Sequence, residues 1–282
     1  MKFKNSNSAQ IDFEAKVPHI TFPVLSELPY IKHGFSTRLG GVSEGIFSSM
    51  NFGIDSSPYP DLKENIIENY KRFAITIGVD PNSLVISKQV HKTNIRVVEK
   101  DDLGKGLYVP ADYSEIDGLI TNQPGITLVT KYADCVPLYF VDTKKKAIGL
   151  THSGWRGTVK KIGKITVEEM TKHFGTNPED IIAVVGPSIC KDCYEIGEEV
   201  AREFEVAFEG AYKKGILQRL DNGKYLCDLW AANREVFIEA GIKGNNIHIS
   251  SVCTCCNSDF MFSHRVTGTS RGSLAAFLAL SE

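Results

Sequence analysis

Three segments of the chain carry side chains that bind transition metals. His91 follows an apolar run, Cys135 lies in a turn between two apolar runs, and His152 lies between an apolar run and a predicted helix. Two imidazoles and one thiolate suit zinc, and three protein ligands leave a fourth position for water or substrate. The residue types therefore indicate a catalytic zinc site. Because the three residues are far apart in sequence, a buried cysteine and two ordinary hydrogen-bonded histidines stay an open alternative.

The segment after His152 indicates an anion site. Gly154-Trp155-Arg156-Gly157-Thr158 opens a predicted helix, whose first N–H groups have no partner within the helix. The glycines allow an anion to approach closely, and Arg156 suits phosphate. Arg38 lies in a second glycine-flanked loop after a predicted strand and is a further candidate for phosphate. Solvent-facing arginines near a helix cap are the alternative interpretation.

The other cysteines fall mainly into two groups. Cys190 and Cys193 form a Cys-x-x-Cys pair, and Cys253, Cys255 and Cys256 follow one another closely. The chain has seven cysteines, an odd number, and the expected reducing compartment argues against a disulfide framework. A structural metal shared by the two groups is one interpretation. Free thiols in loops are the interpretation that the sequence alone favours.

The composition is that of an ordinary globular protein. The 282 residues are 42% hydrophobic and carry a formal net charge of -2. The charge gives no reason to expect a nucleic-acid or membrane partner. The first ten residues lack the apolar stretch of a signal peptide, and no apolar run is long enough to cross a bilayer. We therefore expect a cytoplasmic protein that is a monomer or a weak oligomer.

The elements that position these residues are predicted to be strands with flanking helices. Most of the apolar runs are strand-like, and several suit a sheet covered on both faces. We predict a single-domain α/β or α+β fold, a mixed-sheet sandwich flanked by helices, over residues 17–282 after a tail at residues 1–16. The predicted helices span residues 61–77, 158–174, 197–208 and 229–240. The predicted strands span residues 19–22, 31–37, 84–90, 95–98, 118–121, 126–130, 137–141, 147–150, 181–185, 247–252 and 275–280.

Several short segments together resemble the YfiH-type laccase-domain family, to which the bacterial YlmD proteins belong. The resemblance runs in order from about Pro18 to the C-terminus. One departure is His264, which stands where the family commonly has an aromatic residue before an arginine, and we expect it to affect substrate preference if it lines the pocket. The segments that carry the resemblance are residues 33–43, Asn51-Phe52-Gly53, Gln89-Val90-His91, Asp117-Gly118-Leu119, residues 133–137, residues 152–157 and Gly186-Pro187-Ser188-Ile189.

The resemblance implies a fold shared with a bacterial toxin deamidase and zinc bound by His91, Cys135 and His152. It implies phosphorolysis of adenosine, inosine and S-methyl-5'-thioadenosine to the free base and the (methylthio)ribose 1-phosphate, together with adenosine deamination. The partners would be these small nucleosides and phosphate. Our expected substrate-binding residues are Arg38, Asn51, Gly154 and Arg156, and our expected catalytic residues are Cys135, His152, Arg38 and Asp117, with Asp117 or Asp134 as the general acid.

Three alternative functions stay open at this point, and the third is a binding or regulatory protein that merely holds zinc, against which the open coordination position argues. Members of the family were first described as polyphenol oxidases of the laccase type, which need His-x-His pairs for their copper cluster. The chain has seven histidines and no such pair, although a single copper ion could enter the same site, because copper outcompetes zinc at most nitrogen and sulfur ligands. The second alternative is a Cys–His hydrolase or deamidase, with Cys135 as nucleophile and His152 as its base.

Overall fold

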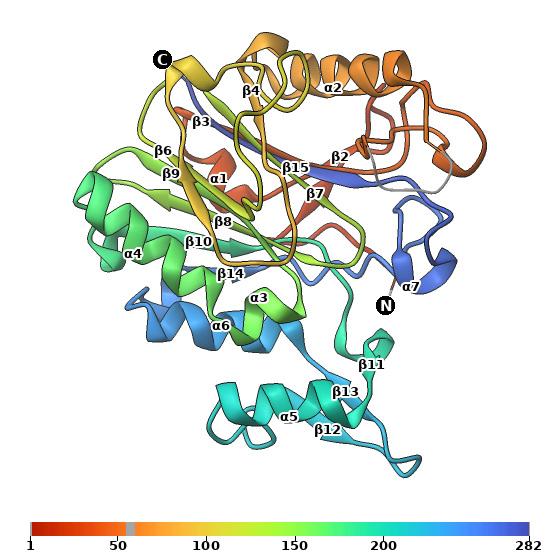
Figure 1. Cartoon of the computed structure of the whole chain (residues 1–282), viewed down its shortest axis with the longest axis vertical. Coiled ribbons are helices and arrows are strands. Elements are labelled where there is room, and N and C mark those ends of the chain that lie inside the picture. Colours follow the sequence, from red (N-terminus) through yellow and green to blue (C-terminus); the bar gives the residue numbers. More distant parts are fainter. Residues whose placement is uncertain (1, 55–59, 282) are drawn as a thin grey trace.

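Two six-stranded sheets pack face to face in the computed structural model, which describes residues 2–54 and 60–281 (Figure 1). Helices cover the outer face of each sheet. Alternation along strand β15, Leu274–Leu280, shows how the layers form. Leu274 and Leu278 point into the core between the sheets, whereas Phe277 points toward the helix on the outer face. A strand covered on both faces is apolar throughout, and this confirms the predicted mixed α/β sandwich flanked by helices.

The first sheet has the strand order β1-β2-β3-β15-β7-β4. Its neighbours are antiparallel except β4 and β7, which are parallel. Helix α2 covers its outer face through Ile66, Tyr70 and Phe73, which recur at helical spacing. Its elements are β1 (Gln10–Ile11), β2 (His19–Thr21), α1 (Pro23–Ser26), β3 (Ile31–Ser36), α2 (Lys63–Ile77), β4 (Leu84–Ile86), β7 (Thr127–Tyr132) and β15.

The second sheet has the strand order β14-β10-β8-β9-β6-β5. The outer pairs β5–β6 and β10–β14 are parallel, and the central pairs are antiparallel. Helices α4 and α6 cover its outer face. Its elements are β5 (Ile95–Val97), β6 (Gly118–Thr121), β8 (Val136–Asp142), β9 (Ala147–Ser153), α3 (Trp155–Val159), α4 (Ile162–Phe174), β10 (Ile181–Val185), α6 (Leu229–Glu239) and β14 (Ile247–Ile249).

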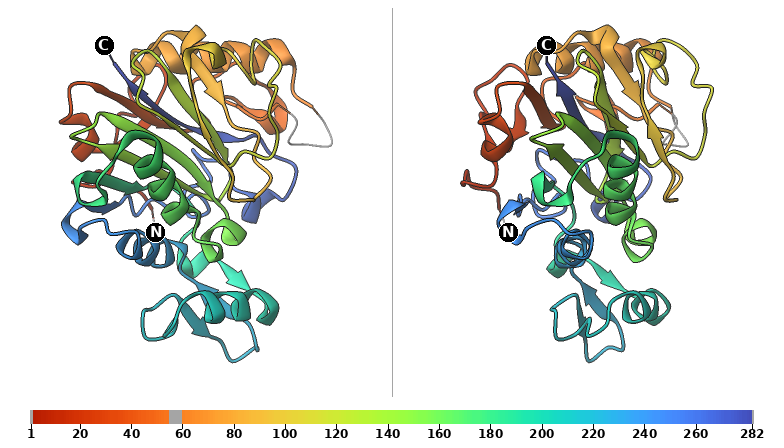
Figure 2. Two further views of the ribbon diagram at one scale, coloured as in Figure 1. Left: turned by 60° about the vertical axis from the view of Figure 1, so that its left-hand side comes forward. Right: turned by 90° about the vertical axis from the view of Figure 1, so that its left-hand side faces the viewer.

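A small third sheet lies with helix α5 at one end of the molecule (Figures 1 and 2). Its strands have the order β11-β13-β12, and each is two or three residues long. We did not predict these strands, because such short runs carry no clear period. The remaining elements are β11 (Glu195–Ile196), α5 (Glu198–Ala207), β12 (Leu217–Arg219), β13 (Tyr225–Cys227) and α7 (His264–Thr267).

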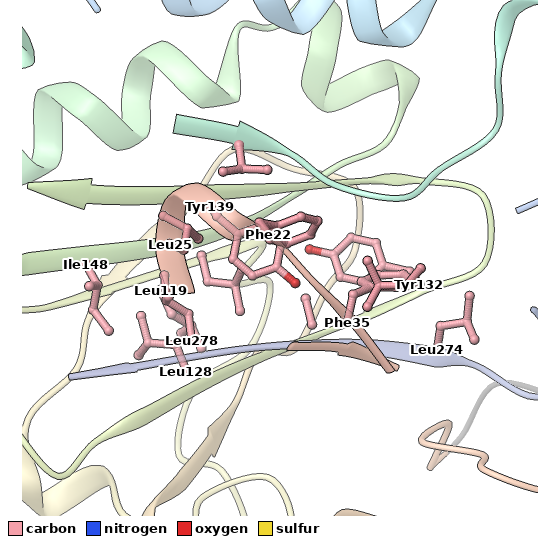
Figure 3. Close-up of a cluster of buried hydrophobic side chains, with 14 of the residues drawn as sticks. Phe22, Leu25, Phe35, Leu119, Leu128, Tyr132, Tyr139, Ile148, Leu274 and Leu278 are labelled. Atoms are coloured by element: carbon pink, nitrogen blue, oxygen red, sulfur yellow. The ribbon is translucent and has the colours of Figure 1, made fainter. Parts of the chain in front are cut away.

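Aromatic side chains fill the space between the two large sheets (Figure 3). Phe22 and Tyr139 meet edge to face with ring centroids 5.1 Å apart, and Phe35 lies 5.8 Å from Tyr132. Such pairs contribute about 0.5–1.5 kcal/mol beyond the burial of their apolar surface. The packed interior gives the strand ends near Tyr132 a rigid support.

Three predicted elements differ from the structure near the candidate site. The helix predicted over residues 158–174 is divided into α3 and α4, because Lys161 takes a left-handed conformation with φ 58°. The buried Thr158 hydroxyl donates to the Gly154 carbonyl at 3.0 Å at the start of α3. Both α3 and α4 pack against α6 and β9. The strand predicted over residues 84–90 ends at Ile86. The strand predicted over residues 147–150 continues to Ser153 and contains His152.

Candidate metal centre

Strand β9 places His152 between two other residues of the site. In the pairing of β8 with β9, Val136 lies opposite Ser153, so Cys135 comes next to the end of β9. In the pairing of β6 with β9, Gly118 lies opposite Thr151, so Asp117 comes beside His152. The backbone N–H of His152 donates to the Asp117 carbonyl at 2.7 Å. Two strand registers thus bring together residues that lie far apart in sequence.

Asp117 also holds the segment that carries His91. Its carboxylate accepts the backbone N–H groups of Val90, His91 and Lys92 at 3.0, 3.0 and 2.9 Å. His91 has φ 62°, a left-handed conformation that costs a residue with a side chain about 1–3 kcal/mol. The three bonds to one carboxylate stabilise this turn and direct the imidazole toward Cys135.

The three candidate ligands converge. A nitrogen from His91, the sulfur of Cys135 and a nitrogen from His152 all lie within 4.8 Å of one another. Cys135 Sγ lies 3.8 Å from His91 Nε2, and a tetrahedral zinc ion bound to both would set this separation at about 3.6 Å. His152 Nδ1 lies 2.9 Å from Asp117, which leaves Nε2 for a metal. The donor set and its geometry fit one metal ion.

Opposite charges develop on Cys135 and His152. Burial raises the pKa of the Cys135 thiol, but His152 and His91 outweigh burial and lower it to about 6. Burial lowers the pKa of His152, whereas Cys135 and Asp117 outweigh burial and raise it to about 9. Without a metal, neutral pH therefore favours a thiolate beside an imidazolium. A thiolate is the form that binds metal, and it is also the form that attacks an electrophile.

The three side chains open into a cavity of about 680 Å³. Its wall carries the basic residues Lys88, Lys131 and Arg271, together with Glu115. His264, the departure from the family pattern, lines this cavity and also a smaller one of about 170 Å³ that reaches His91 and Cys135. The larger cavity has the volume of a site for a small-molecule ligand.

The structure places the two predicted arginines in different cavities. Arg156 is exposed, stacks on Trp155 at 4.3 Å and lines the smaller cavity beside Cys135. Arg38 lies over the ring of Phe262 at 4.6 Å and donates from Nε to the Ser48 carbonyl at 2.8 Å. It lines a third cavity of about 230 Å³ and is not among the described residues around the metal candidates.

Three other predicted site residues support the site from behind. Asn51 is fully buried, and its Oδ1 accepts the N–H of Ser273 at 2.8 Å, so the amide holds a cavity wall and does not line the cavity. Asp117 is also fully buried, and its bonds to His152 and the His91 turn fit a positioning role better than proton transfer. A Cβ atom on Gly154 would lie 2.8 Å from His91 Cδ2, so this glycine makes room for the ligands.

Sequence reasoning missed Arg271. It lines both the main cavity and the cavity of Arg38. Burial lowers the pKa of its guanidinium and outweighs the opposite effect of Asp134 and Cys135. A signal was present, because Arg271 is followed by Gly272 directly before the closing strand, as Arg38 is followed by glycines after a strand. Asp134, our other candidate for the general acid, accepts the hydroxyl of Thr254 at 2.6 Å and the N–H of Arg265 at 2.7 Å.

Fold and site together define an α/β protein with a candidate mononuclear metal centre in an open cavity. The sequence model of the family described as multi-copper polyphenol oxidoreductase laccase matches residues 32–281. The chain belongs to this laccase-like YfiH family. Within residues 2–54 and 60–281, one of the two groups of potential ligands contains histidine, and it has three members. The described part of the chain therefore offers no cluster of several histidine-bound copper ions.

Relatives that are named as nucleoside enzymes match most of the chain. It is 34% identical to the purine nucleoside phosphorylase YlmD of Bacillus subtilis (strain 168) over 254 residues, 88% of each chain. It is 37% identical to adenosine deaminase RL5 from an unknown prokaryotic organism over 202 residues, 71% of this chain and 76% of the relative. The crystal structure of YlmD from Geobacillus stearothermophilus has a TM-score of 0.89 at 29% identity and covers 98% of this chain and 100% of its own. Their names support a nucleoside-processing role in the family.

The length and hydropathy of the helices can be compared with those of a membrane-spanning segment. None of the helices in the described residues is long and apolar enough to cross a bilayer.

Proposed function

We propose that the chain is a zinc-dependent purine nucleoside enzyme that cleaves adenosine, inosine and S-methyl-5'-thioadenosine with phosphate and also deaminates adenosine. The convergence of His91, Cys135 and His152 beside a cavity with a basic wall carries the proposal. Two imidazoles and a thiolate suit zinc, and three ligands leave one position open. The similarity to the purine nucleoside phosphorylase YlmD and to adenosine deaminase RL5 suggests the substrate class.

Phosphorolysis joins a phosphate oxygen to the anomeric carbon while the bond from that carbon to the purine nitrogen breaks. The purine then leaves with a proton on its ring. In our proposal, Arg271 and Lys88 hold phosphate against the cavity wall and stabilise its charge as it attacks. When bound, zinc supplies Lewis-acid polarisation and, for deamination, a water of lowered pKa.

Residues behind the site keep its geometry fixed. Asp117 holds His152 with its proton on Nδ1 and orients the turn of His91. His264 lies where the two cavities meet and is placed to contact the nucleoside. We expect the histidine at this position to alter the preference among purine nucleosides relative to family members with an aromatic residue.

Product analysis tests the proposal. Zinc-loaded protein is incubated with adenosine, with and without phosphate, and the products are separated by chromatography. We expect adenine and ribose 1-phosphate only when phosphate is present. Deamination should give ammonia under both conditions, with inosine as the product without phosphate and inosine plus hypoxanthine with it. Release of neither adenine nor inosine, from protein whose zinc content has been verified, would overturn the assignment.

The Cys135–His152 pair favours a second candidate, a Cys–His hydrolase. A thiolate beside an imidazolium is the arrangement of a cysteine nucleophile with its base. The Cys135→Ala variant separates the two candidates. A ligand role predicts that zinc content and turnover fall together, whereas a nucleophile role predicts that turnover falls while zinc stays bound. Copper-dependent polyphenol oxidation is examined by repeating the metal loading with copper and adding a phenolic substrate.

A further inference from the structure

Two Cys-x-x-Cys pairs that are distant in sequence meet in the structure. Cys190 precedes a short 3-10 helix, Lys191–Cys193, that follows β10 and ends at Cys193, whereas Cys253 and Cys256 lie in the loop after β14. Their four sulfur atoms all lie within 4.8 Å of one another. We propose that these four cysteines bind one zinc ion as a tetrathiolate site, separate from the centre at His91, Cys135 and His152.

The distances fit tetrahedral coordination. The sulfur atoms of Cys193 and Cys256 are 3.5 Å apart, and those of Cys190 and Cys256 are 3.9 Å apart. Four sulfurs bound at about 2.3 Å to one zinc ion would be separated by about 3.8 Å. A disulfide would bring two sulfurs to about 2.05 Å, and all seven cysteines are free. A single metal ion explains why all four sulfurs lie close to one another. Separate disulfides would bring the sulfurs together only two at a time.

Backbone hydrogen bonds already support one of the sulfurs. Cys253 Sγ accepts the N–H groups of Cys190 and Cys256, both at 3.3 Å. Hydrogen bonds of this kind orient a thiolate ligand and stabilise its charge. The bond from Cys190 also joins the two pairs, whereas the bond from Cys256 lies within one pair. Cys255, in the same loop, is outside the group of four and packs against the apolar cluster of the second sheet.

The proposed site would brace the turn that carries Cys135. Its two loops run side by side, with a parallel bridge between Ser188 and Cys253. Between them they hold Asp134, because Ile189 N–H donates to its carbonyl at 3.0 Å and the Thr254 hydroxyl donates to its carboxylate at 2.6 Å. A metal that closes the long connection between these loops would stabilise this arrangement entropically.

Metal analysis tests the proposal on the full chain, expressed and purified with zinc under reducing conditions. We expect the wild-type protein to hold one more zinc ion per chain than the Cys193→Ser variant. Cys255→Ser is the matched control, because it removes a thiol from the same loop, and it should keep the wild-type zinc content. The His91→Ala variant removes a ligand of the other centre. Loaded with cobalt, it should show the sulfur-to-metal charge-transfer bands of a tetrathiolate.

Four results would overturn the proposal. Equal zinc in wild type and Cys193→Ser would show that these thiols hold no metal, and equal loss in Cys255→Ser would show that the group of four is wrong. A mass spectrum of the freshly purified wild-type chain with Cys190 and Cys193 joined as a disulfide would replace the site by a thiol pair. Should Cys193→Ser fail to fold, the folded His91→Ala protein is titrated with a mercurial reagent. Zinc release in step with four thiols supports the site, and no release overturns it.

Discussion

Asp117 connects two of the three candidate ligands although it touches neither the cavity nor the proposed metal. One carboxylate accepts the N–H groups around His91 and the Nδ1 proton of His152. Burial raises the pKa of Asp117, but His152 and the backbone donors outweigh burial and lower it. The group is therefore ionised at neutral pH and oriented by its donors. We infer that it organises the site and does not transfer a proton.

We predict that Asp117→Asn weakens zinc binding by about 10- to 100-fold, because an amide cannot accept all four donors. The measurement is competition for zinc against a chromophoric chelator. Asp142→Asn is the matched control, because Asp142 is equally buried and accepts the N–H groups of Lys144 and Lys145 away from the site. Its zinc affinity should equal that of wild type. Unchanged affinity in Asp117→Asn would contradict the positioning role.

A second prediction concerns the arginines. Arg271 shares the main cavity with the candidate ligands, whereas Arg38 does not, so we expect Arg271→Ala to slow phosphorolysis on the order of a hundredfold. Deamination uses water and should fall much less. The measurement is the ratio of adenine to ammonia formed from adenosine at saturating phosphate, with Arg38→Ala and Arg156→Ala beside it. An equal loss of both products in Arg271→Ala would mean that Arg271 holds the nucleoside or the fold.

The sequence predicted the candidate ligands but not the residues around them. His91, Cys135 and His152 stand out because few residue types bind zinc, and the family motifs contain them. Arg271 and Lys88 do not stand out, because basic residues are common on surfaces and the cavity forms only when distant segments fold together. For the same reason, Asn51 belongs to a recognised motif but its burial and bonding became visible only in three dimensions.

The register between strands fixes where the segments of the site lie, just as Asp117 fixes where its neighbouring side chains lie. Both neighbours of β9 begin beside His152, so one strand fixes the relative positions of Cys135, Asp117 and His152. A slip by one residue would turn these side chains to the opposite face. The strands themselves could be predicted from their apolar runs. Their pairing could not, because many orders of the same strands satisfy the same pattern.

Gly154, directly before α3, packs closely against two of the candidate ligands. A methyl group there would lie 2.8 Å from His91 Cδ2, closer than real contacts allow, and 3.2 Å from Cys135 Sγ, which is a tight contact. We predict that Gly154→Ala displaces the ligands and lowers the zinc content of the His–Cys–His centre. Gly197→Ala is the matched control, because Gly197 precedes α5 with a similar extended backbone and a Cβ atom there meets nothing within 4 Å.

The measurement for this pair is zinc per chain after dialysis against a weak chelator, with circular dichroism to verify folding. Only Gly154→Ala should lose zinc. Full zinc retention in Gly154→Ala would mean that the loop of His91 shifts to accommodate the methyl group. The close contact would then have no effect on zinc binding. If Gly154 instead allows an anion to approach, Gly154→Ala should weaken phosphate binding and leave the zinc content unchanged.

Across the whole molecule, the four layers bury several polar groups that ordinarily face water. His33 on β3 is 6% exposed, stacks on Phe22 and accepts the Phe22 N–H through Nε2 at 2.8 Å. Burial, with a smaller contribution from His19, lowers the pKa of His33 to about 3. The neutral ring is therefore part of the folded sandwich, and protonation opposes folding.

This burial makes stability depend on pH with a defined sign. The unfolded chain binds a proton at His33 below about pH 6.5, whereas the folded chain stays neutral down to about pH 3. The free energy of unfolding should therefore be undiminished above about pH 6.5 and fall as the pH decreases toward 3. For this residue the loss between pH 7 and pH 5 is about 2 kcal/mol. Chemical denaturation at several pH values measures the slope.

The control for this last prediction is His33→Gln, whose carbonyl can still accept the Phe22 N–H but cannot be protonated. Both proteins are stripped of metal first, because protonation of ligands would otherwise release zinc and add its own pH dependence. The other histidines except His19, which interacts with His33, contribute equally to both proteins, so the difference between the two slopes reports mainly on His33. We expect the variant to be less stable at pH 7 and to lose less stability on acidification. Parallel curves for the two proteins would mean that His33 gains access to water and is protonated without unfolding the sandwich.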